Sequence, residues 1–218
     1  MKKILLLCFL AGGVLWACDT IEGSGIHADE ERNVQASYEG VRVEEGILLL
    51  FSSSLPPGRI HLSGDSDILS YVEAYVDSRG DLHLRYEPWV KIKTHIPTVA
   101  TFPETVGLRR ITASGGARIQ AFYEIDSPSL ELKASGGSEI SISGWVDQAN
   151  ITLSGGSQLR AYDLGVADLQ AHLSGGSQVE ITCTYRLKVT ASGGSQLYYR
   201  GSAQVEKSLS GGSQVERR

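Results

Sequence analysis

The sequence is poor in cysteine and methionine, with three cysteines and one methionine among 218 residues. Cys8 lies inside an apolar N-terminal segment and Cys18 ends that segment, so Cys183 has no predicted partner in the mature chain. We therefore expect no disulfide. No histidine lies close to Cys183 in the sequence to activate it as a nucleophile. We interpret Cys183 as a small buried hydrophobic residue.

The sequence also lacks the common signatures of enzymes. It has no G-x-S-x-G elbow, no P-loop and no dinucleotide-binding fingerprint. The outward acids of its repeats fall in different columns, which argues against the acid clusters of polysaccharide-cleaving enzymes. We therefore expect no catalytic residues and no cofactor, and a polysaccharide-acting enzyme is the weakest hypothesis.

Metal-ligand patterns are missing as well. None of the five histidines has metal-ligand spacing: His27, His61, His83, His95 and His172. Calcium-binding nonapeptide repeats need an aspartate after their glycines, and the glycine repeats of this chain have none there. Asp65 and Asp67 could hold a cation near Asp29 or Glu30, but an ordinary acidic loop is the simpler interpretation. We expect no metal.

The sequence has fewer basic than acidic residues. The chain has 20 Lys and Arg against 25 Asp and Glu, which gives a formal net charge of −5. Residues 1–17 contain two lysines and no acid, so their removal would lower the charge by two, to −7. Nucleic-acid binding needs clustered basic residues, so we expect no nucleic-acid partner.

The first eighteen residues, MKKILLLCFLAGGVLWAC, have the organisation of an export signal. Two lysines precede an apolar stretch over residues 4–14, which is shorter than the roughly 20 residues that span a bilayer. The final L-W-A-C resembles the lipobox of bacterial lipoproteins. We predict a lipoprotein signal peptide over residues 1–17, a lipidated Cys18 and a flexible tether over 18–31. The predicted location is the cell envelope, at the outer membrane; an ordinary signal peptide is the alternative.

The chain is rich in one repeated turn. The tetrapeptide S-G-G-S, with S-G-G-A as its first copy, occurs six times at spacings of 21, 19, 20, 18 and 18 residues. The predicted structural turns are Ser114, Gly115, Gly116, Ser135, Gly136, Gly137, Ser154, Gly155, Gly156, Ser174, Gly175, Gly176, Ser192, Gly193, Gly194, Ser210, Gly211 and Gly212. Paired glycines adopt dihedral angles that cost other residues energy, and serines bond nearby backbone groups. We interpret this column as architecture; binding of a repetitive ligand is the alternative.

Apolar and polar residues alternate on both sides of each turn, which is typical of half-buried strands. Three positions before each turn stand Ile111, Leu132, Ile151, Ala171, Val189 and Lys207. A fixed period near twenty is typical of a solenoid. We predict an all-β fold, a parallel β-helix or solenoid with regular coils of about 18–21 residues over 108–218. An antiparallel meander is the alternative, although it would not need the same turn at the same phase.

The N-terminal part, residues 32–107, has strand-like but irregular segments and no convincing amphipathic helix. The sequence S-G-D-S at Ser63–Ser66 looks like a degenerate copy of the repeated turn. We expect this part to be an irregular β beginning of the same stack that caps its first regular coil.

Four glutamines follow the turns at the same phase and are expected to form an outward ladder with a step of about 4.8 Å. With two tyrosines they make the predicted ligand stripe: Gln158, Gln178, Gln196, Gln214, Tyr162 and Tyr198. Phe122, Trp145 and Tyr185 fall in the returns between coils. Flat rings beside polar ladders suit sugar faces, but rings that only cover the coil are the simpler interpretation.

The chain resembles the head-GIN-domain family of auto-transporter adhesins. The matching segments are NVQASYEGVRV (33–43), GDSDIL (64–69), DLHL (81–84) and the A-S-G-G and L-S-G-G-S-Q turns. This resemblance covers residues 32–216 and implies a right-handed parallel β-helix and export to the envelope, but no established activity or site residues. We expect a lipid-anchored, non-enzymatic envelope protein that binds a glycan or a host-surface ligand. A structural spacer without a ligand is the alternative.

Overall fold

The computed structural model describes residues 20–35, 37–105 and 107–218; the predicted signal peptide and Cys18 lie outside the described residues. The N-terminal elements are β1 (Thr20–Glu22), β2 (His27–Asn33), β3 (Gly40–Val43), β4 (Leu48–Ser52), β5 (Arg59–Asp65), the 3-10 helix η1 (Leu69–Tyr71), β6 (Val72–Val76), β7 (Asp81–Tyr86), β8 (Lys91–Lys93) and β9 (Val99–Pro103). The repeated part contains β10 (Arg110–Ala113), β11 (Arg118–Ala134), β12 (Glu139–Leu153), β13 (Gln158–Leu173), β14 (Gln178–Ala191), β15 (Gln196–Arg200), β16 (Gln204–Leu209) and β17 (Gln214–Arg217). Within these ranges, no helix has the length and apolar character needed to cross a bilayer.

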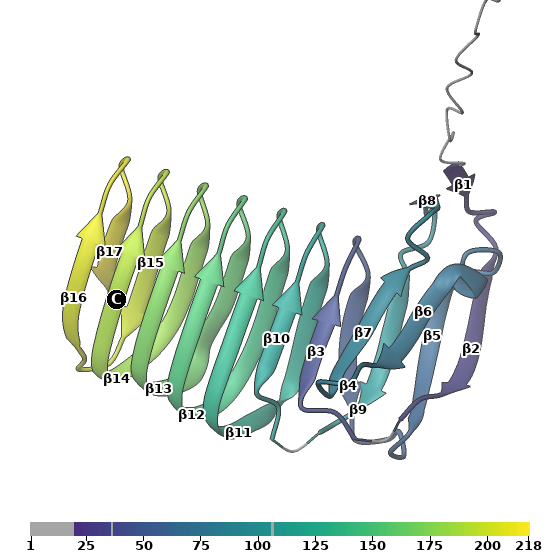
Figure 1. Cartoon of the computed structure of the whole chain (residues 1–218), viewed down its shortest axis with the longest axis horizontal. Helices are drawn as coiled ribbons and strands as arrows, with labels where there is room; N and C mark the ends of the chain where they lie inside the picture. Colours follow the sequence, from purple (N-terminus) through teal and green to yellow (C-terminus); the bar gives the residue numbers. More distant parts are fainter. Residues whose placement is uncertain (1–19, 36, 106) are drawn as a thin grey trace, which may run out of the picture.

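Strands β10 to β17 form a parallel stack in which equivalent residues of successive coils lie side by side (Figure 1). Ile111, Leu132, Ile151, Ala171 and Val189 pair in this order, each with its equivalent in the next coil. All five are buried in one continuous apolar core. The predicted parallel solenoid is therefore confirmed, and the antiparallel meander is wrong for this part of the chain.

Each coil has two legs and two corners. A first leg leads into the S-G-G-S bend, a second leg leaves it, and a return corner connects to the next coil. Strands β11, β12, β13 and β14 each hold the second leg of one coil and the first leg of the next, which explains their lengths of 14 to 17 residues. In Figure 1 the first legs lie at the front and the bends form the upper edge.

The S-G-G-S bends are tight turns with a buried hydroxyl. In the bend from Ser154 to Ser157, Gly155 and Gly156 have φ angles of 64° and 77°, as a type I′ turn requires. The Ser157 amide donates to the Ser154 carbonyl oxygen at 3.3 Å, and the buried Ser157 hydroxyl donates to the same oxygen at 2.8 Å. The hydroxyl bond recurs in the bends that begin at Ser135, Ser174, Ser192 and Ser210.

Cys183 lies in the core, as expected of a small hydrophobic residue. It is fully buried and pairs with Val166 of the preceding coil. Its thiol donates to the carbonyl oxygen of Arg186 at 3.1 Å, and burial raises the pKa of this thiol above its ordinary value. A protonated, buried thiol is a poor nucleophile.

The N-terminal part continues the same interior columns. Val41 of β3 and then Leu82 of β7 extend the column of Ile111. The bend between β3 and β4 has Glu45 at φ 59° followed by Gly46 at φ 75°. The repeat pattern of the sequence did not reveal this bend, because V-E-E-G-I contains neither the serines nor the glycine pair.

The interpretation of Ser63–Ser66 as a repeated turn was wrong. Gly64 and Asp65 belong to β5, which runs antiparallel to β2 and β9. The Asp65 side chain is fully buried and is held by backbone amides rather than placed in a surface bend.

Antiparallel strands cover the N-terminal end of the stack: β6 lies on β7, while β5 lies on β9 and β2 lies on β5. The predicted flexible tether over 18–31 is therefore wrong for its described residues, because β1 pairs with β8 and β2 with β5. At the other end of the described residues, β16 and β17 are the last strands. Lys207 stands there in the interior column of Val189, and such a charge discourages further strand pairing.

Candidate functional site

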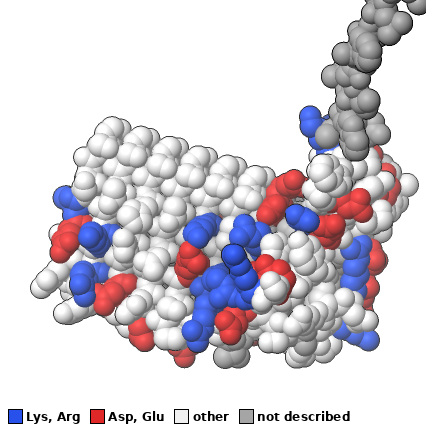
Figure 2. Space-filling model, viewed as in Figure 1, with Lys and Arg blue, Asp and Glu red and all other residues white. Residues whose placement is uncertain are grey.

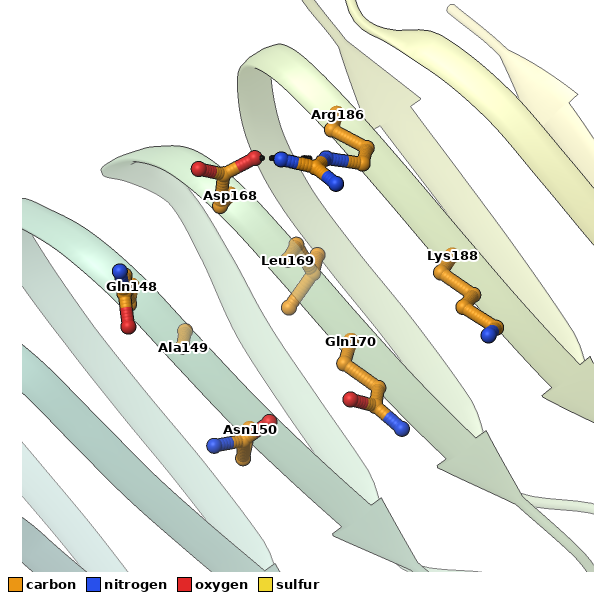
Figure 3. A pocket seen from close by; sticks show the side chains of 8 residues that line it. All are labelled: Gln148, Ala149, Asn150, Asp168, Leu169, Gln170, Arg186 and Lys188. Carbon is orange, nitrogen blue, oxygen red and sulfur yellow. Dashed lines mark hydrogen bonds and ion pairs between the residues drawn. The ribbon is translucent and has the colours of Figure 1, made fainter.

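A shallow polar groove of about 350 Å³ crosses the first legs of three neighbouring coils, on β12, β13 and β14 (Figure 3). Its lining residues are Gln148, Ala149, Asn150, Asp168, Leu169, Gln170, Arg186 and Lys188. Ala149 and Leu169 are buried, and the six polar residues surround them. The groove therefore combines a small apolar floor with amide, carboxylate and cationic groups.

Strand register brings the polar residues of the groove together. Gln148, Asp168 and Arg186 pair across the three coils. Two residues further along, Asn150, Gln170 and Lys188 pair in the same way. Since side chains on a strand alternate between faces, both rows point outward while the residue between them points into the core. The sequence pattern does not reveal this site, because its six polar residues follow no repeated motif and only strand register relates them.

The charges of the groove are exposed and partly paired. The Arg186 Nε atom donates to Asp168 Oδ1 at 3.1 Å, and the two side chains are 59 % and 34 % exposed (Figure 3). Such an exposed ion pair contributes little to stability, so a ligand can rearrange it at small cost. Within the described ranges, Lys188 has no carboxylate partner at ion-pair distance. The groove is therefore polar with a small excess of positive charge.

Two exposed aromatic rings lie in the return corners that lead into the groove. Trp145 is 45 % exposed and precedes Gln148 by three residues, and Tyr185 is 64 % exposed and directly precedes Arg186. The Trp145 ring covers Gly165 of the next coil so closely that a Cβ added there would clash with the indole. Glycine at this position thus allows the indole to approach the backbone. Trp145 and Tyr185 stand on the coils that flank β13.

The predicted glutamine column exists, but it lies on the second legs, away from the groove. Gln158, Gln178, Gln196 and Gln214 pair directly in successive coils. Three of them bond a neighbour two residues along their own strand: Gln158 bonds Arg160, Gln178 bonds Glu180 and Gln196 bonds Tyr198. The column is a row of separate strand-internal contacts, and its role in ligand binding stays a prediction.

The two tyrosines of the predicted stripe do not offer open ring faces. Tyr198 is only 8 % exposed, and the Arg218 guanidinium lies 3.5 Å from its ring centroid. Tyr162 has the Arg200 guanidinium 4.1 Å from its ring centroid, and its hydroxyl is buried without a hydrogen-bond partner among the residues described. An arginine therefore lies over each of the two rings, and their role in ligand binding stays a prediction.

The acidic residues that could have held a cation have another use. Asp65 Oδ1 accepts the amide of Gly25 at 2.8 Å, and Oδ2 accepts the amides of His95 and Ile96 at 2.8 and 3.0 Å. Burial alone would raise the pKa of Asp65, but these three donors hold it below its ordinary value. Asp67 accepts the amide and hydroxyl of Ser24. The described ranges hold no cluster of three potential metal ligands.

A second hollow, of about 500 Å³, lies between the N-terminal strands and the first bends. It is lined by Thr20, Glu45, Gly46, Tyr86, Val90, Lys91, Ile92 and Gly115. Burial of the Glu45 carboxyl raises its pKa above the ordinary value. The polar groove remains the better candidate site, because a row of outward amides, Gln148, Asn150 and Gln170, lines it.

Comparison with known proteins places the fold in a family. A family model described as "Putative auto-transporter adhesin, head GIN domain" matches residues 37–139 and 109–203. A search of curated proteins gives no match.

Solved structures of similar fold include proteins from Bacteroides and Parabacteroides, and these are distant in sequence. A "putative adhesin" from Bacteroides fragilis NCTC 9343 is 15 % identical, with a TM-score of 0.66 over 91 % of this chain and 100 % of that chain. A "putative adhesin" from Parabacteroides merdae ATCC 43184 is 16 % identical, with a TM-score of 0.55 over 92 % and 99 %. A "Putative lipid binding protein" from Parabacteroides distasonis ATCC 8503 is 14 % identical, with a TM-score of 0.56 over 92 % and 100 %. At these identities the likeness shows the fold alone.

Proposed function

Because the chain belongs to the head GIN domain family of auto-transporter adhesins, we propose that it is a non-enzymatic cell-envelope protein that binds a glycan through the polar groove. We further propose that lipid on Cys18 anchors it in the outer membrane. The observation that carries the binding proposal is the groove itself. Six outward polar residues lie together there on three coils, and Trp145 and Tyr185 are exposed in the return corners that precede these residues in the chain.

The chemistry of the groove suits sugar hydroxyls. Amide side chains such as Asn150 and Gln170 both donate and accept hydrogen bonds, and the Asp168–Arg186 pair supplies a strong acceptor beside a strong donor. Aromatic rings offer apolar faces beside polar groups. Because coils are spaced by about 4.8 Å, three of them span roughly 10 Å. This length favours a short stretch of an oligosaccharide over a single small molecule.

The alternative is a structural spacer that has no ligand. The buried second serines support it, because their hydroxyls are all used inside the bends and the most repeated residues of the chain therefore serve architecture. The spacer and the adhesin make opposite predictions for binding by the soluble chain.

A glycan array with the soluble chain of residues 19–218 tests the proposal. We expect binding that falls at least tenfold in the double variant Gln170→Ala with Lys188→Ala. The matched control is Gln158→Ala with Gln178→Ala, which removes two outward side chains from the second legs and should leave binding unchanged. Absence of binding at high concentration would favour the spacer. Unchanged binding in the groove variant would place the ligand elsewhere, and equal loss in both variants would contradict the groove as the specific site.

The location needs its own experiment. Protease treatment of intact cells separates surface display from a periplasmic position. Cleavage of the chain on intact cells would support an adhesin that meets host or matrix glycans. Full protection until the outer membrane is opened would exclude host adhesion and leave envelope glycans as the ligands to test.

A further inference from the structure

The residues that follow the predicted lipid site are fixed to the body of the domain. Strand β1 pairs in parallel with β8, with Thr20 beside Lys91 and Glu22 beside Lys93. The Glu22 carboxylate accepts a hydrogen bond from Lys93 Nζ at 2.6 Å. Asp65 then ties Gly25 to the chain that follows β8 through its three amide bonds. The segment from Thr20 to Gly25 therefore cannot swing away from the domain as a loose linker would.

Covalent geometry then limits where a lipid on Cys18 can lie. Only Asp19 separates Cys18 from Thr20. Two residues span at most about 7 Å when fully extended. A lipid attached to Cys18 must therefore start close to Thr20 and to its strand partner Lys91.

The surface at this place has the residues of a membrane interface. Trp89 is 78 % exposed, the joint highest exposure among the large hydrophobic residues of the described chain. Lys91, two residues further on, is exposed and has no described carboxylate partner at ion-pair distance. Val90 and Ile92 are half-buried, and Ile92 packs against the core. Tryptophan favours the headgroup region of a bilayer, and lysine is attracted to anionic lipid phosphates.

The row of S-G-G-S bends on this side of the molecule carries no charged side chains. In Figure 1, β1 and β8 lie on the same side as the row of S-G-G-S bends. Figure 2 shows no charged residues along the bends of the repeated coils, while the charges lie lower on the legs. A surface without charged groups can approach a membrane without removing ionic groups from water. The polar groove lies on the first legs and would face sideways, open to a ligand.

We propose that Thr20, Trp89 and Lys91 form an anchor edge that rests on the bilayer surface, so that the anchored domain is held against the membrane in one orientation. This inference rests on the proposed lipid anchor at Cys18. The anchor edge contacts the headgroup layer of the membrane that holds the lipid, and Trp89 inserts at the interface.

Tryptophan quenching by brominated phospholipids tests the anchor edge. The full chain, produced with its leader, is reconstituted in phosphatidylethanolamine and phosphatidylglycerol vesicles. Processing at Cys18 would leave only Trp89 and Trp145. In the Trp145→Phe variant, the remaining Trp89 should be quenched at least about twofold by lipid brominated near the headgroups. In the Trp89→Phe variant, the remaining Trp145 should stay unquenched.

Two Lys→Glu substitutions test whether the quenching of Trp89 depends on the charge of the anchor edge. Lys91→Glu in the Trp145→Phe background should reduce the quenching of Trp89 by about half or more. Lys188→Glu lies in the groove and should leave it unchanged. If the chain binds vesicles but Trp89 is no more quenched than Trp145, the anchor edge is wrong and the lipid anchor stands. If the chain does not remain with the vesicles, the lipid anchor is wrong and the edge falls with it.

Discussion

The regular coils and the N-terminal part share interior columns but form their bends differently. In the regular coils, each first glycine packs on the bend of the preceding coil, and a Cβ added to Gly155 would lie 3.0 Å from the amide nitrogen of Gly136. In the β3–β4 bend, Glu45 holds the equivalent position at φ 59°. Among the described residues, no such bend packs beneath Glu45; the hollow of about 500 Å³ that it lines lies there instead.

This difference separates two reasons why the first position of a bend needs glycine: a positive φ angle and a close neighbouring backbone. A positive φ disfavours side chains by about 1–2 kcal/mol, and Glu45 shows that the fold accepts this cost once. The stacked neighbour adds a steric cost that only the regular coils carry. The second glycine of each regular bend, by contrast, has no atom within 4 Å of an added Cβ. The first position therefore needs glycine more strictly than the second.

The two parts also differ in what holds them. The regular coils repeat one small bend, whereas the N-terminal part adds to its apolar core one buried carboxylate, Asp65, that binds three backbone amides. Asp65→Ala should destabilise the chain more than any of the substitutions below, since three backbone amides lose their acceptor. Urea unfolding measures the loss. Asp67→Ala, which removes an exposed carboxylate bound to Ser24, is the control and should cost much less; equal losses would contradict the assigned role of Asp65.

The same carboxylate should make the N-terminal part sensitive to acid. Its pKa is lowered in the folded chain, so its contribution is complete above the unfolded value of about 4 and is lost as pH falls through the lower folded value. Stability of the wild-type chain should therefore decline below about pH 4, and the Asp65→Asn variant should show a flatter decline. Thermal unfolding of both chains from about pH 2 to about pH 7 measures the two declines. Identical slopes would mean that Asp65 does not carry this dependence.

Gly155→Val tests the stacked bend. We expect a loss of about 2–3 kcal/mol, because valine combines an unfavourable positive φ with a backbone contact that cannot relax. Gly156→Ala should cost only about 1 kcal/mol. Glu45→Gly should change stability by less than about 1 kcal/mol. A similar loss in Gly155→Val and Gly156→Ala would contradict the stacking argument.

The second serine of the bend is expected to contribute less than the first glycine. Ser177→Ala should cost about 1 kcal/mol, since it removes one hydrogen bond to the Ser174 carbonyl and leaves a small void. The first bend already has Ala117 at this position, fully buried, which shows that the backbone turn does not require the hydroxyl. Urea unfolding of the variant checks the value. A loss above about 3 kcal/mol would show that the hydroxyl column acts cooperatively.

The glutamine column should matter least for folding. Gln178→Ala removes an outward side chain whose one described hydrogen bond, of 3.4 Å, goes to Glu180. We expect a change below about 0.5 kcal/mol by urea unfolding. A large loss would mean that the glutamines bind one another between coils and carry structure.

Repetition decided what the sequence could predict. The column of Ile111, Leu132 and Ile151 followed from a fixed spacing between alternating residues, and strand pairing confirms it. The Glu44–Ile47 bend could not be found in this way, because it keeps the backbone geometry of the repeat and none of its serines. The antiparallel cap also has no repeat to reveal it, and its strands depend on contacts between residues far apart in the chain, such as Gly25 with Asp65.

The candidate groove lay beyond sequence reasoning for a related reason. Asn150, Gln170 and Lys188 occupy the same column, but three different residue types at one phase of a repeat read as ordinary surface variation. The repeated glutamines instead indicated a ligand site on the second legs. The low exposure of Tyr198 could not be predicted, because the arginine over its ring is Arg218, twenty residues later in the chain.

The most direct test of the stacked register uses engineered disulfides in the groove. In the soluble chain of residues 19–218 with Cys183→Ser, Asn150→Cys and Gln170→Cys are partners on adjacent strands. Their Cα atoms should lie about 4.8 Å apart, within the range that a disulfide bridges. This pair should cross-link fully under mild oxidation, while Asn150→Cys with Lys188→Cys, two coils apart, should stay reduced. Cross-linking of the distant pair, or none in the adjacent pair, would contradict the register that forms the groove.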